Sequence, residues 1–327
     1  MKKGFGCFGL AMAAALVLGF AAPVMAKDFT ITMATPSNPD DNCVKAFFKF
    51  KELVEERSKG RIEVEVKHTG QLGGHRDYIE QIRMGSLQAA EINVAVLSAV
   101  DSKFMVFDLP YISKNQKWLE DRLEGQVGKT FAESLEKSAG IKILGWMVRS
   151  PRDMYISSRP VVTAADFKGM KVRIMESPVM RRTFELLEAV PVPLSANERY
   201  MALQTKVVDA AENSVSLIIT QKEYEVTKFV SLTEHFISPN IIAMDPKFFA
   251  KLPADLQAIV AKAGNEAGHY ATKLDADSEQ TALTELKKLG MAVNDCPDKS
   301  SFQQKVNPIY AEYRDKIGGD VIDAFTK

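Results

Sequence analysis

Short segments in which apolar and polar residues alternate are separated along the chain by longer segments with a helical spacing of apolar residues. Residues 29–33 and 61–67 alternate, which predicts two half-buried strands. Between them, the apolar residues of segment 44–54 recur every three or four positions, which predicts a helix. The same order continues through four further elements: a helix at 78–85, a buried strand at 89–96, one long helix at 118–135 and a strand at 141–148. Strands that alternate with helices are typical of an α/β fold with a largely parallel sheet.

A second α/β unit is predicted to begin near Arg149. Thr163 and Asp166 have the spacing of a capping box, so a short helix is expected to start there. Residues 170–175 then alternate, which places Arg173 on a rigid strand rather than on a loop. A guanidinium held in this way offers a planar set of donors that matches a carboxylate.

The last third of the chain has a different pattern. Residues 253–289 keep a helical spacing of apolar residues without an interrupting proline, although Gly264 and Gly268 would permit a bend. A continuous helix of this size would be about 50 Å long, which exceeds the width of one domain and indicates that it lies across two lobes. Residues 302–313 predict a last long helix.

The N-terminus has the pattern of a secretory signal peptide. Lys2 and Lys3 precede an apolar stretch at 7–18, and small residues lead up to Ala26. The stretch is too short and too interrupted for a membrane span. We therefore expect residues 1–26 to be a signal peptide, cleaved after Ala26, and the mature chain to be exported to the periplasm.

The composition of the chain bears on its possible partners and on the source of its stability. The chain has 42 basic and 42 acidic residues and no basic block, which argues against binding to nucleic acid. Only Cys43 and Cys296 remain in the predicted mature chain, and the sequence leaves open whether they pair. We expect stability to come from hydrophobic burial over two domains.

No motif for catalysis, cofactor binding or metal binding occurs. The four histidines stand outside HExxH and HxH patterns, and no GxSxG, GxGxxG or P-loop is found: they are His68, His75, His235 and His269. We therefore predict a protein without catalytic residues, metal or cofactor.

Arginines and an amide instead gather where predicted strands end. Arg149 and Arg152 follow the strand that ends near residue 148, Arg173 ends another, and Asn213 follows a third. Ligands of open α/β sheets bind beyond the carboxyl ends of strands. Convergence there would hold an organic acid through charge-assisted hydrogen bonds, although Arg149 and Arg152 could also be surface residues.

Several segments together resemble the periplasmic solute-binding proteins of tripartite ATP-independent periplasmic (TRAP) transporters, the DctP family. The resemblance extends over nearly the whole predicted mature chain, in order. The segments are Gln71–Gly74 with Arg76, Phe107–Tyr111, Asp166–Arg173, Tyr200–Gln204, Val208–Asp209, Glu212–Asn213, Tyr224–Val226 and Thr233–His235. The sequence has Asp209-Ala210 where Asp-Gly is common in the family, and Asn213-Ser214 where Asn-Pro is common, so the substrate subgroup stays open.

The resemblance implies a two-lobe periplasmic-binding-protein-like fold, with mixed or parallel sheets, a hinge and a long helix that spans both lobes. Lobe I would comprise residues 27–148 plus 239–278, and lobe II residues 149–238 plus 279–327. Hinges are expected where the chain crosses between lobes, near Val148–Arg149 and near Ser238–Pro239.

The resemblance also implies a set of ligand contacts. Arg173 would pair with the substrate carboxylate, with Arg152 and Asn213 as further contacts. Asn93 on its strand and His75 in its loop would tune specificity. The ligand would be an organic acid, either a sugar acid such as a uronate or a C4-dicarboxylate, delivered to the membrane permease of a TRAP transporter.

Physical reasoning suggests how such a binder would close. In an open cleft Arg152 and Arg173 would be solvated and would repel each other, and a carboxylate would remove that repulsion on closure. His235 is expected to have a structural role. Two other functions stay open: a ligand-sensing subunit, and a secreted α/β enzyme acting on a small acid.

Overall fold

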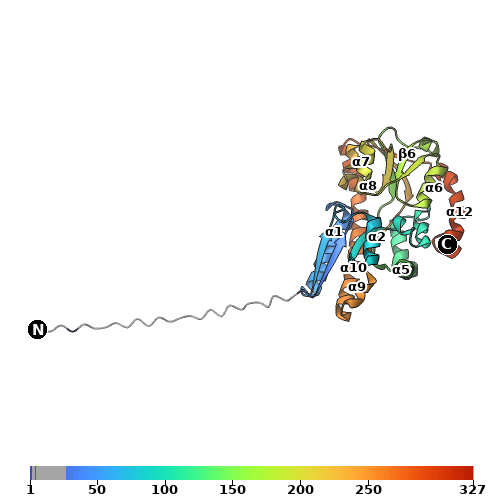
Figure 1. Ribbon diagram of the computed structural model, residues 1–327. Helices are drawn as coiled ribbons and strands as arrows, with labels where there is room; N and C mark the ends of the chain where they lie inside the picture. Colours follow the sequence, from blue (N-terminus) through green and yellow to red (C-terminus); the bar gives the residue numbers. More distant parts are fainter. Residues whose placement is uncertain (2–3, 5–26, 327) are drawn as a thin grey trace.

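The computed structural model describes residues 1, 4 and 27–326, so the predicted signal peptide lies almost entirely outside the described residues. The strands form two separate sheets, one in each half of the molecule (Figure 1). None of the helices within the described part of the chain is long and apolar enough to cross a membrane.

The first sheet has five strands. Their spatial order is β2 (Ile62–Lys67), β1 (Phe29–Ala34), β3 (Ala89–Asn93), β10 (Asn240–Met244) and β4 (Lys142–Met147). Strand β1 pairs in parallel with β2 and β3, whereas β10 runs antiparallel to both β3 and β4.

The second sheet has six strands. Their spatial order is β11 (Ala292–Asp295), β9 (Phe229–Phe236), β5 (Arg152–Ile156), β8 (Ala210–Asn213), β6 (Lys171–Ile174) and β7 (Val190–Pro193). Strand β5 is antiparallel to β8 and β9, and the other pairs are parallel. Both sheets are therefore mixed, and the expectation of largely parallel sheets is corrected. The antiparallel pairs all involve β5 or β10, the strands that follow a crossing between the sheets.

Helices cover both sheets. Those before the first crossing are α1 (Asn42–Arg57), α2 (His75–Met84), α3 (Val94–Leu97), the 3-10 helix η1 (Ser102–Asp108), α4 (Gln116–Glu124) and α5 (Gln126–Ala139). Those between the crossings are η2 (Ala164–Phe167), α6 (Pro178–Leu186), α7 (Arg199–Gln204), α8 (Val215–Thr220) and η3 (Glu223–Glu225). The remainder are α9 (Pro246–Lys251), α10 (Ala254–Lys288), α11 (Ser300–Val306), α12 (Pro308–Ile317) and α13 (Gly319–Thr326).

The chain passes between the sheets along three routes. Residues 148–151 lead from β4 to β5, and residues 237–239 lead from β9 back to β10. The third route is α10, which packs on α1 and β4 of one half and on α8 and β11 of the other (Figure 1).

Helix α10 is continuous over 35 residues, a point that the sequence had left open. Its glycines do not interrupt it and allow a close approach to β4. A Cβ atom on Gly264 would lie 2.5 Å from the Cβ of Leu144, and one on Gly268 would lie 2.5 Å from the carbonyl oxygen of Trp146. Gly145 on β4 completes the contact, since a Cβ there would lie 2.2 Å from the Gly264 carbonyl oxygen.

Three predicted elements are shorter than expected. The helix predicted over 118–135 is broken at Gly125, which is extended (φ −91°, ψ −154°) and separates α4 from α5. The last helix is broken at Asn307, because Pro308 has no N–H to continue the hydrogen-bond ladder. Strand β3 ends at Asn93, whose side chain accepts from Ala95 N at 2.9 Å and so caps α3.

Apolar side chains from helices and sheet form the core of each half, and the last helix, α13, packs on the first half. The apolar core beneath α1 and α10 includes Phe47, Phe50 and Val260, all fully buried. The end of the chain packs against η1 and α5, with Phe325 in edge contact with Phe107 (ring centroids 5.5 Å apart). Cys43 and Cys296 are both buried and free, and are not joined by a disulfide.

Candidate ligand-binding site between the two sheets

Two adjoining cavities lie between the sheets, with volumes of about 300 and 230 Å³. They share four lining residues: His75, Met175, Ala196 and Asn197. The larger is lined by the ends of β3 and β10 in the first sheet and of β5 and β8 in the second. A ligand there would contact both halves of the molecule.

The five residues predicted to contact a ligand all line these cavities. Arg152, Asn213, Asn93 and His75 line the larger cavity, and Arg173, again with His75, lines the smaller. The structure thus brings together side chains from both sheets, as the α/β argument expected. Their contact with a ligand stays a prediction.

Arg173 is fully buried but has no carboxylate partner among the described residues. Its Nε and Nη2 donate to the carbonyl oxygen of Leu194 at 2.9 and 2.6 Å, and its Nη1 makes no hydrogen bond. Burial lowers the pKa of Arg173 to about 10, with a further contribution from the positive charge of Arg199. The guanidinium is therefore still charged at neutral pH, with unused donors at the smaller cavity.

Arg152 is also buried, but the carboxylate of Glu212 neutralises it. Its Nε and Nη2 donate to the two carboxylate oxygens, and Nη2 also reaches the Glu212 carbonyl oxygen at 2.8 Å. Both arginines are buried here, and the charge of Arg152 contributes to the lowered pKa of Arg173, so solvation and repulsion in an open cleft stay a prediction. Four of the five N–H groups of Arg152 are used within the protein, since Nη1 donates to Asn213 Oδ1 at 2.9 Å.

Asn213 and Asn93 differ in which of their hydrogen-bonding groups remain available to a ligand. Asn213 accepts through Oδ1 from Arg152 and from Ser214 N, and its Nδ2 donates no hydrogen bond within the described residues. Asn93 is more fully used: it donates to Asn240 Oδ1 at 2.6 Å and accepts from Ser238 Oγ at 3.0 Å. Asn213 therefore offers a free donor at the cavity.

His75 is the first residue of α2, not a loop residue as predicted. Its Nδ1 lies 3.0 Å from the carbonyl oxygen of Glu91, which can only accept, so Nδ1 carries the proton. Burial lowers the pKa of His75 to about 4, and the positive charges of Arg173 and Arg149 act in the same direction. The ring is thus neutral at physiological pH, and its Nε2 is an acceptor.

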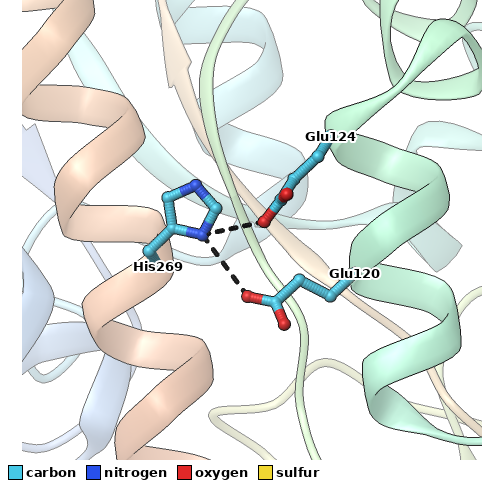
Figure 2. A group of neighbouring side chains, drawn as sticks. All are labelled: Glu120, Glu124 and His269. Atoms are coloured by element: carbon cyan, nitrogen blue, oxygen red, sulfur yellow. Dashed lines mark hydrogen bonds and ion pairs between the residues drawn. The ribbon is translucent and has the colours of Figure 1, made fainter.

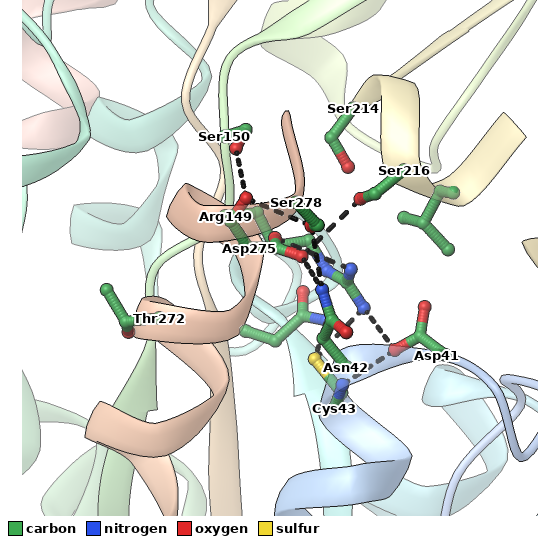
Figure 3. A network of polar contacts seen from close by, with 12 residues as sticks. Asp41, Asn42, Cys43, Arg149, Ser150, Ser214, Ser216, Thr272, Asp275 and Ser278 are labelled. Carbon is green, nitrogen blue, oxygen red and sulfur yellow. Dashed lines mark hydrogen bonds and ion pairs between the residues drawn. The ribbon is translucent and has the colours of Figure 1, made fainter. Parts of the chain in front are cut away.

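Arg149 holds the first crossing in place rather than lying on the surface. Its Nη2 donates to Asp41 Oδ1 at 2.8 Å, and its Nη1 lies 3.7 Å from Asp275 Oδ2 on α10 (Figure 3). Glu91, on the other side, lies 3.7 Å from Nη2. With one arginine among three buried carboxylates, burial raises the pKa of Glu91, and the charge of Asp41 raises it further.

Two further charged residues line the larger cavity and were not predicted: Arg199 on α7 and Glu223 on η3. They form a buried ion pair, with Arg199 Nε 2.5 Å from Glu223 Oε1. The only nearby sequence signal was the capping box formed by Ser195 and Glu198. It predicts the start of a helix but indicates no role for Arg199, the residue that follows. The partner of Arg199 lies 24 positions away, beyond any local pattern.

Comparison with known proteins identifies the family. The model for bacterial extracellular solute-binding proteins, family 7, matches residues 33–316. This chain belongs to the DctP family. It is a solute-binding protein of the TRAP type, and its relatives share both its sequence pattern and its two-sheet architecture.

Relatives of this TRAP solute-binding protein bind small acids. It is 32% identical over 323 residues to a solute-binding protein of Sulfitobacter sp. NAS-14.1, covering 97% of this chain and 95% of the relative. A TRAP periplasmic solute-binding protein from the same strain, crystallised with β-D-galacturonate, is 29% identical with a TM-score of 0.87, covering 90% and 99% of the two chains. A third, from Sulfurospirillum deleyianum with bound succinate, is 27% identical with a TM-score of 0.88, covering 92% and 99%.

His235 lies outside both cavities. Its Nδ1 is 2.8 Å from Thr233 Oγ1, its Nε2 is 3.9 Å from Glu212 Oε2, and burial lowers its pKa to about 4. It packs beside the Arg152–Glu212 pair, in a place suited to the structural role predicted for it.

One group of described side chains outside the cavities has donor atoms close enough to share a metal ion. Glu120 and Glu124 lie one turn apart on α4, and His269 on α10 has its Nδ1 at 3.3 and 3.2 Å from their oxygens (Figure 2). No local motif indicates this group, because Glu120 and His269 are 149 positions apart. A hydrogen bond between the ring nitrogen of His269 and Glu120 is sufficient to account for the arrangement.

Proposed function

We propose that this protein captures an organic acid between its two halves and delivers it to the membrane permease of a TRAP transporter. The observation that carries the proposal is Arg173, a buried, charged guanidinium that has no carboxylate partner in the described chain. An unpaired buried charge is costly, so a carboxylate at the smaller cavity would remove a penalty that the free protein carries.

Binding of this kind would be coupled to a movement of the two halves. We assign residues 27–148 plus 239–278 to lobe I and 149–238 plus 279–327 to lobe II, with hinges near Val148–Arg149 and Ser238–Pro239. The cavities are lined from both sheets, so a ligand makes its full set of contacts only when the lobes are together. Such differential contact favours the closed population.

The carboxylate would sit at Arg173, with Arg152 and Asn213 contributing one remaining N–H and one amide nitrogen. His75 and Asn93 would contact the part of the ligand that lies away from this carboxylate. Bound galacturonate and succinate in similar proteins support two ligand classes, sugar acids and C4-dicarboxylates. No chemical change of the ligand is part of this role.

The place of action would be the periplasm. Residues 1–26 have the charge and apolar pattern of a signal peptide, so cleavage after Ala26 would release a chain that begins at Lys27. Similar proteins are described as periplasmic, which supports the same location.

A thermal-shift screen tests the proposal. The full chain is expressed, purified from the periplasm and heated with organic acids and with matched neutral sugars. Acids that bind should raise the unfolding midpoint with a dependence on ligand concentration, because they bind only the folded state. If no carboxylate raises the midpoint, or if neutral sugars raise it as much, the proposal is wrong.

A further inference from the structure

A partly exposed group of three side chains joins α4 to α10, away from both cavities. Glu120 and Glu124 lie four positions apart on α4, which places them on one face of that helix, and His269 lies opposite them on α10 (Figure 2). None of the three lines either cavity. The group therefore lies outside the site proposed above.

The spacing of the three donor atoms matches the coordination sphere of a small divalent ion. His269 Nδ1 is 3.3 Å from Glu120 Oε1 and 3.2 Å from Glu124 Oε1, and the three donor atoms all lie within 4.8 Å of one another. Zinc binds imidazole nitrogen and carboxylate oxygen at about 2.0–2.2 Å in a tetrahedron, which places two ligand atoms about 3.3 Å apart. The nitrogen is thus already at the ligand-to-ligand distance from both oxygens.

The two carboxylates share one ring nitrogen. Without an ion, the hydrogen bond between His269 Nδ1 and Glu120 holds the group together. Glu124 makes no hydrogen bond to that nitrogen, and among the described residues it forms an ion pair with His269 but with no lysine or arginine. Since carboxylate oxygens only accept, a single N–H cannot serve both, whereas one divalent cation would bind both at once.

The two helices that carry the donor atoms are held in a fixed register. Gln116, at the start of α4, donates through Nε2 to the carbonyl oxygen of Thr272 on α10 at 3.1 Å, about one turn from the donor residues on each helix. Gly268, the residue before His269, packs closely on the backbone of Trp146 in β4. Donor atoms on rigid elements lose little conformational freedom when they bind an ion.

The ring of His269 is oriented for coordination through Nδ1. Its Nε2 is turned away from both carboxylates (Figure 2) and makes no hydrogen bond within the described residues. The ring proton can therefore move to Nε2 and leave the Nδ1 lone pair to the ion. One imidazole nitrogen with two carboxylates is a donor set of zinc and related transition ions, whereas magnesium and calcium prefer oxygen ligands throughout.

We propose that Glu120, Glu124 and His269 bind one divalent transition ion of the zinc type. Solvent completes the coordination, because the side chains of Glu124 and His269 are 46% and 42% exposed. Since α10 packs on elements of both halves, the ion fastens α4 to the helix that runs between them. The site needs no organic acid, so it stands or falls separately from the proposed function.

Calorimetry with zinc chloride tests this on the full chain, purified from the periplasm without a histidine tag and freed of metal with a chelator. One ion should bind per chain and raise the unfolding midpoint, because it binds the folded state. Magnesium chloride at the same concentrations should leave the midpoint unchanged. If zinc does not bind, or if magnesium raises the midpoint as much, the inference is wrong.

Two variants locate the ion. Glu124→Gln and His269→Gln each remove one ligand from a partly exposed position, so the zinc-free unfolding midpoint should stay close to that of the wild type. The dissociation constant for zinc should rise at least about tenfold in each variant. An unchanged zinc affinity in His269→Gln would overturn the site.

Each variant has a matched control. Asp121→Asn removes an exposed carboxylate of the same helix that pairs with Lys117, and His68→Gln removes a partly exposed histidine whose Nδ1 lies 2.9 Å from the Thr69 hydroxyl. Both controls should bind zinc like the wild type. If Asp121→Asn weakens binding as much as Glu124→Gln, general surface charge attracts the ion and the site is refuted.

Discussion

Both Nε and Nη2 of Arg173 donate to a single acceptor, the carbonyl oxygen of Leu194, at 2.9 and 2.6 Å. This contact fixes the plane of the guanidinium on β6 and turns the unbonded Nη1 away from the backbone of Leu194. The group is held in orientation without being neutralised. Such an arrangement would suit an anion from outside the chain, as the proposed function requires.

Replacing Arg173 by methionine should separate binding from stability. The variant keeps much of the side-chain volume but removes the charge, so the ligand-free unfolding midpoint should stay the same or rise. The carboxylate loses its partner, and the dissociation constant should increase roughly a hundredfold or more. Calorimetry and thermal unfolding measure the two effects. Arg173→Lys, which keeps the charge without the planar fork, should lie between the two.

For the Arg152–Glu212 pair we expect a substitution to lower the stability of the folded protein. Glu212→Gln leaves Arg152 buried and uncompensated, which should lower the free energy of unfolding by about 3–5 kcal/mol in chemical denaturation. Glu312→Gln is the control, because it breaks an exposed pair with Arg182 and should cost under about 1 kcal/mol. Equal losses in the two variants would contradict the role of burial.

Asp108 should make stability depend on pH. It is buried beside Ser177, whose hydroxyl donates to it at 2.6 Å, and burial raises its pKa to about 7. Between pH 3.8 and 7 the folded state binds more protons than the unfolded state, so this group's contribution falls as pH rises through that window. Asp108→Asn should therefore be more stable than the wild type at pH 8 by a few kcal/mol, and by a clearly smaller margin at pH 5.

The measurement is denaturant unfolding of both proteins at pH 5 and pH 8. Comparing the two proteins at each pH removes the contributions of His75 and His235, which have lowered pKa values and act with the opposite sign. A stability difference that does not change with pH would show that Asp108 does not titrate in this range.

The close contact between α10 and β4 should not tolerate a methyl group. Gly268→Ala raises helix propensity by about 1 kcal/mol but places a Cβ 2.5 Å from the Trp146 carbonyl oxygen. Overpacking should dominate, with a net loss of about 1–3 kcal/mol in denaturant unfolding. Gly125→Ala is the control: its nearest neighbour would be 3.5 Å away, and its backbone suits alanine. A more stable Gly268→Ala would contradict this packing.

Local patterns predicted much of this fold. The box at Thr163 and Asp166 is present, with Asp166 Oδ2 accepting from Thr163 N at 2.8 Å, and Ser177 caps α6 ahead of Pro178. The long helical pattern of α10 followed from a proline-free stretch, although its continuity did not. Each of these features depends on neighbours within a few positions, which a sequence records directly.

Features set by distant contacts could not be predicted in the same way. The break at Gly125 depends on how α5 returns against α4, where a Cβ on Gly128 would lie 1.8 Å from the Leu123 carbonyl oxygen. Pro308 in the sequence indicates a break in the last helix, but the helical spacing of apolar residues on both sides of it predicted one continuous helix. At the site, position at strand ends indicated Arg152 and Arg173, but only the structure distinguishes an arginine with a carboxylate from one without.

The unbroken course of α10 across both sheets has a mechanical consequence. The connections at 148–151 and 237–239 are short and not helical, and buried contacts such as that of Arg149 with Asp41 hold the first of them in place. A helix resists curvature, because hydrogen bonds on its convex side must lengthen. A rotation of one sheet against the other would therefore have to bend α10 or shift it on one of its two neighbours, so the stiffness of this single element resists such a rotation.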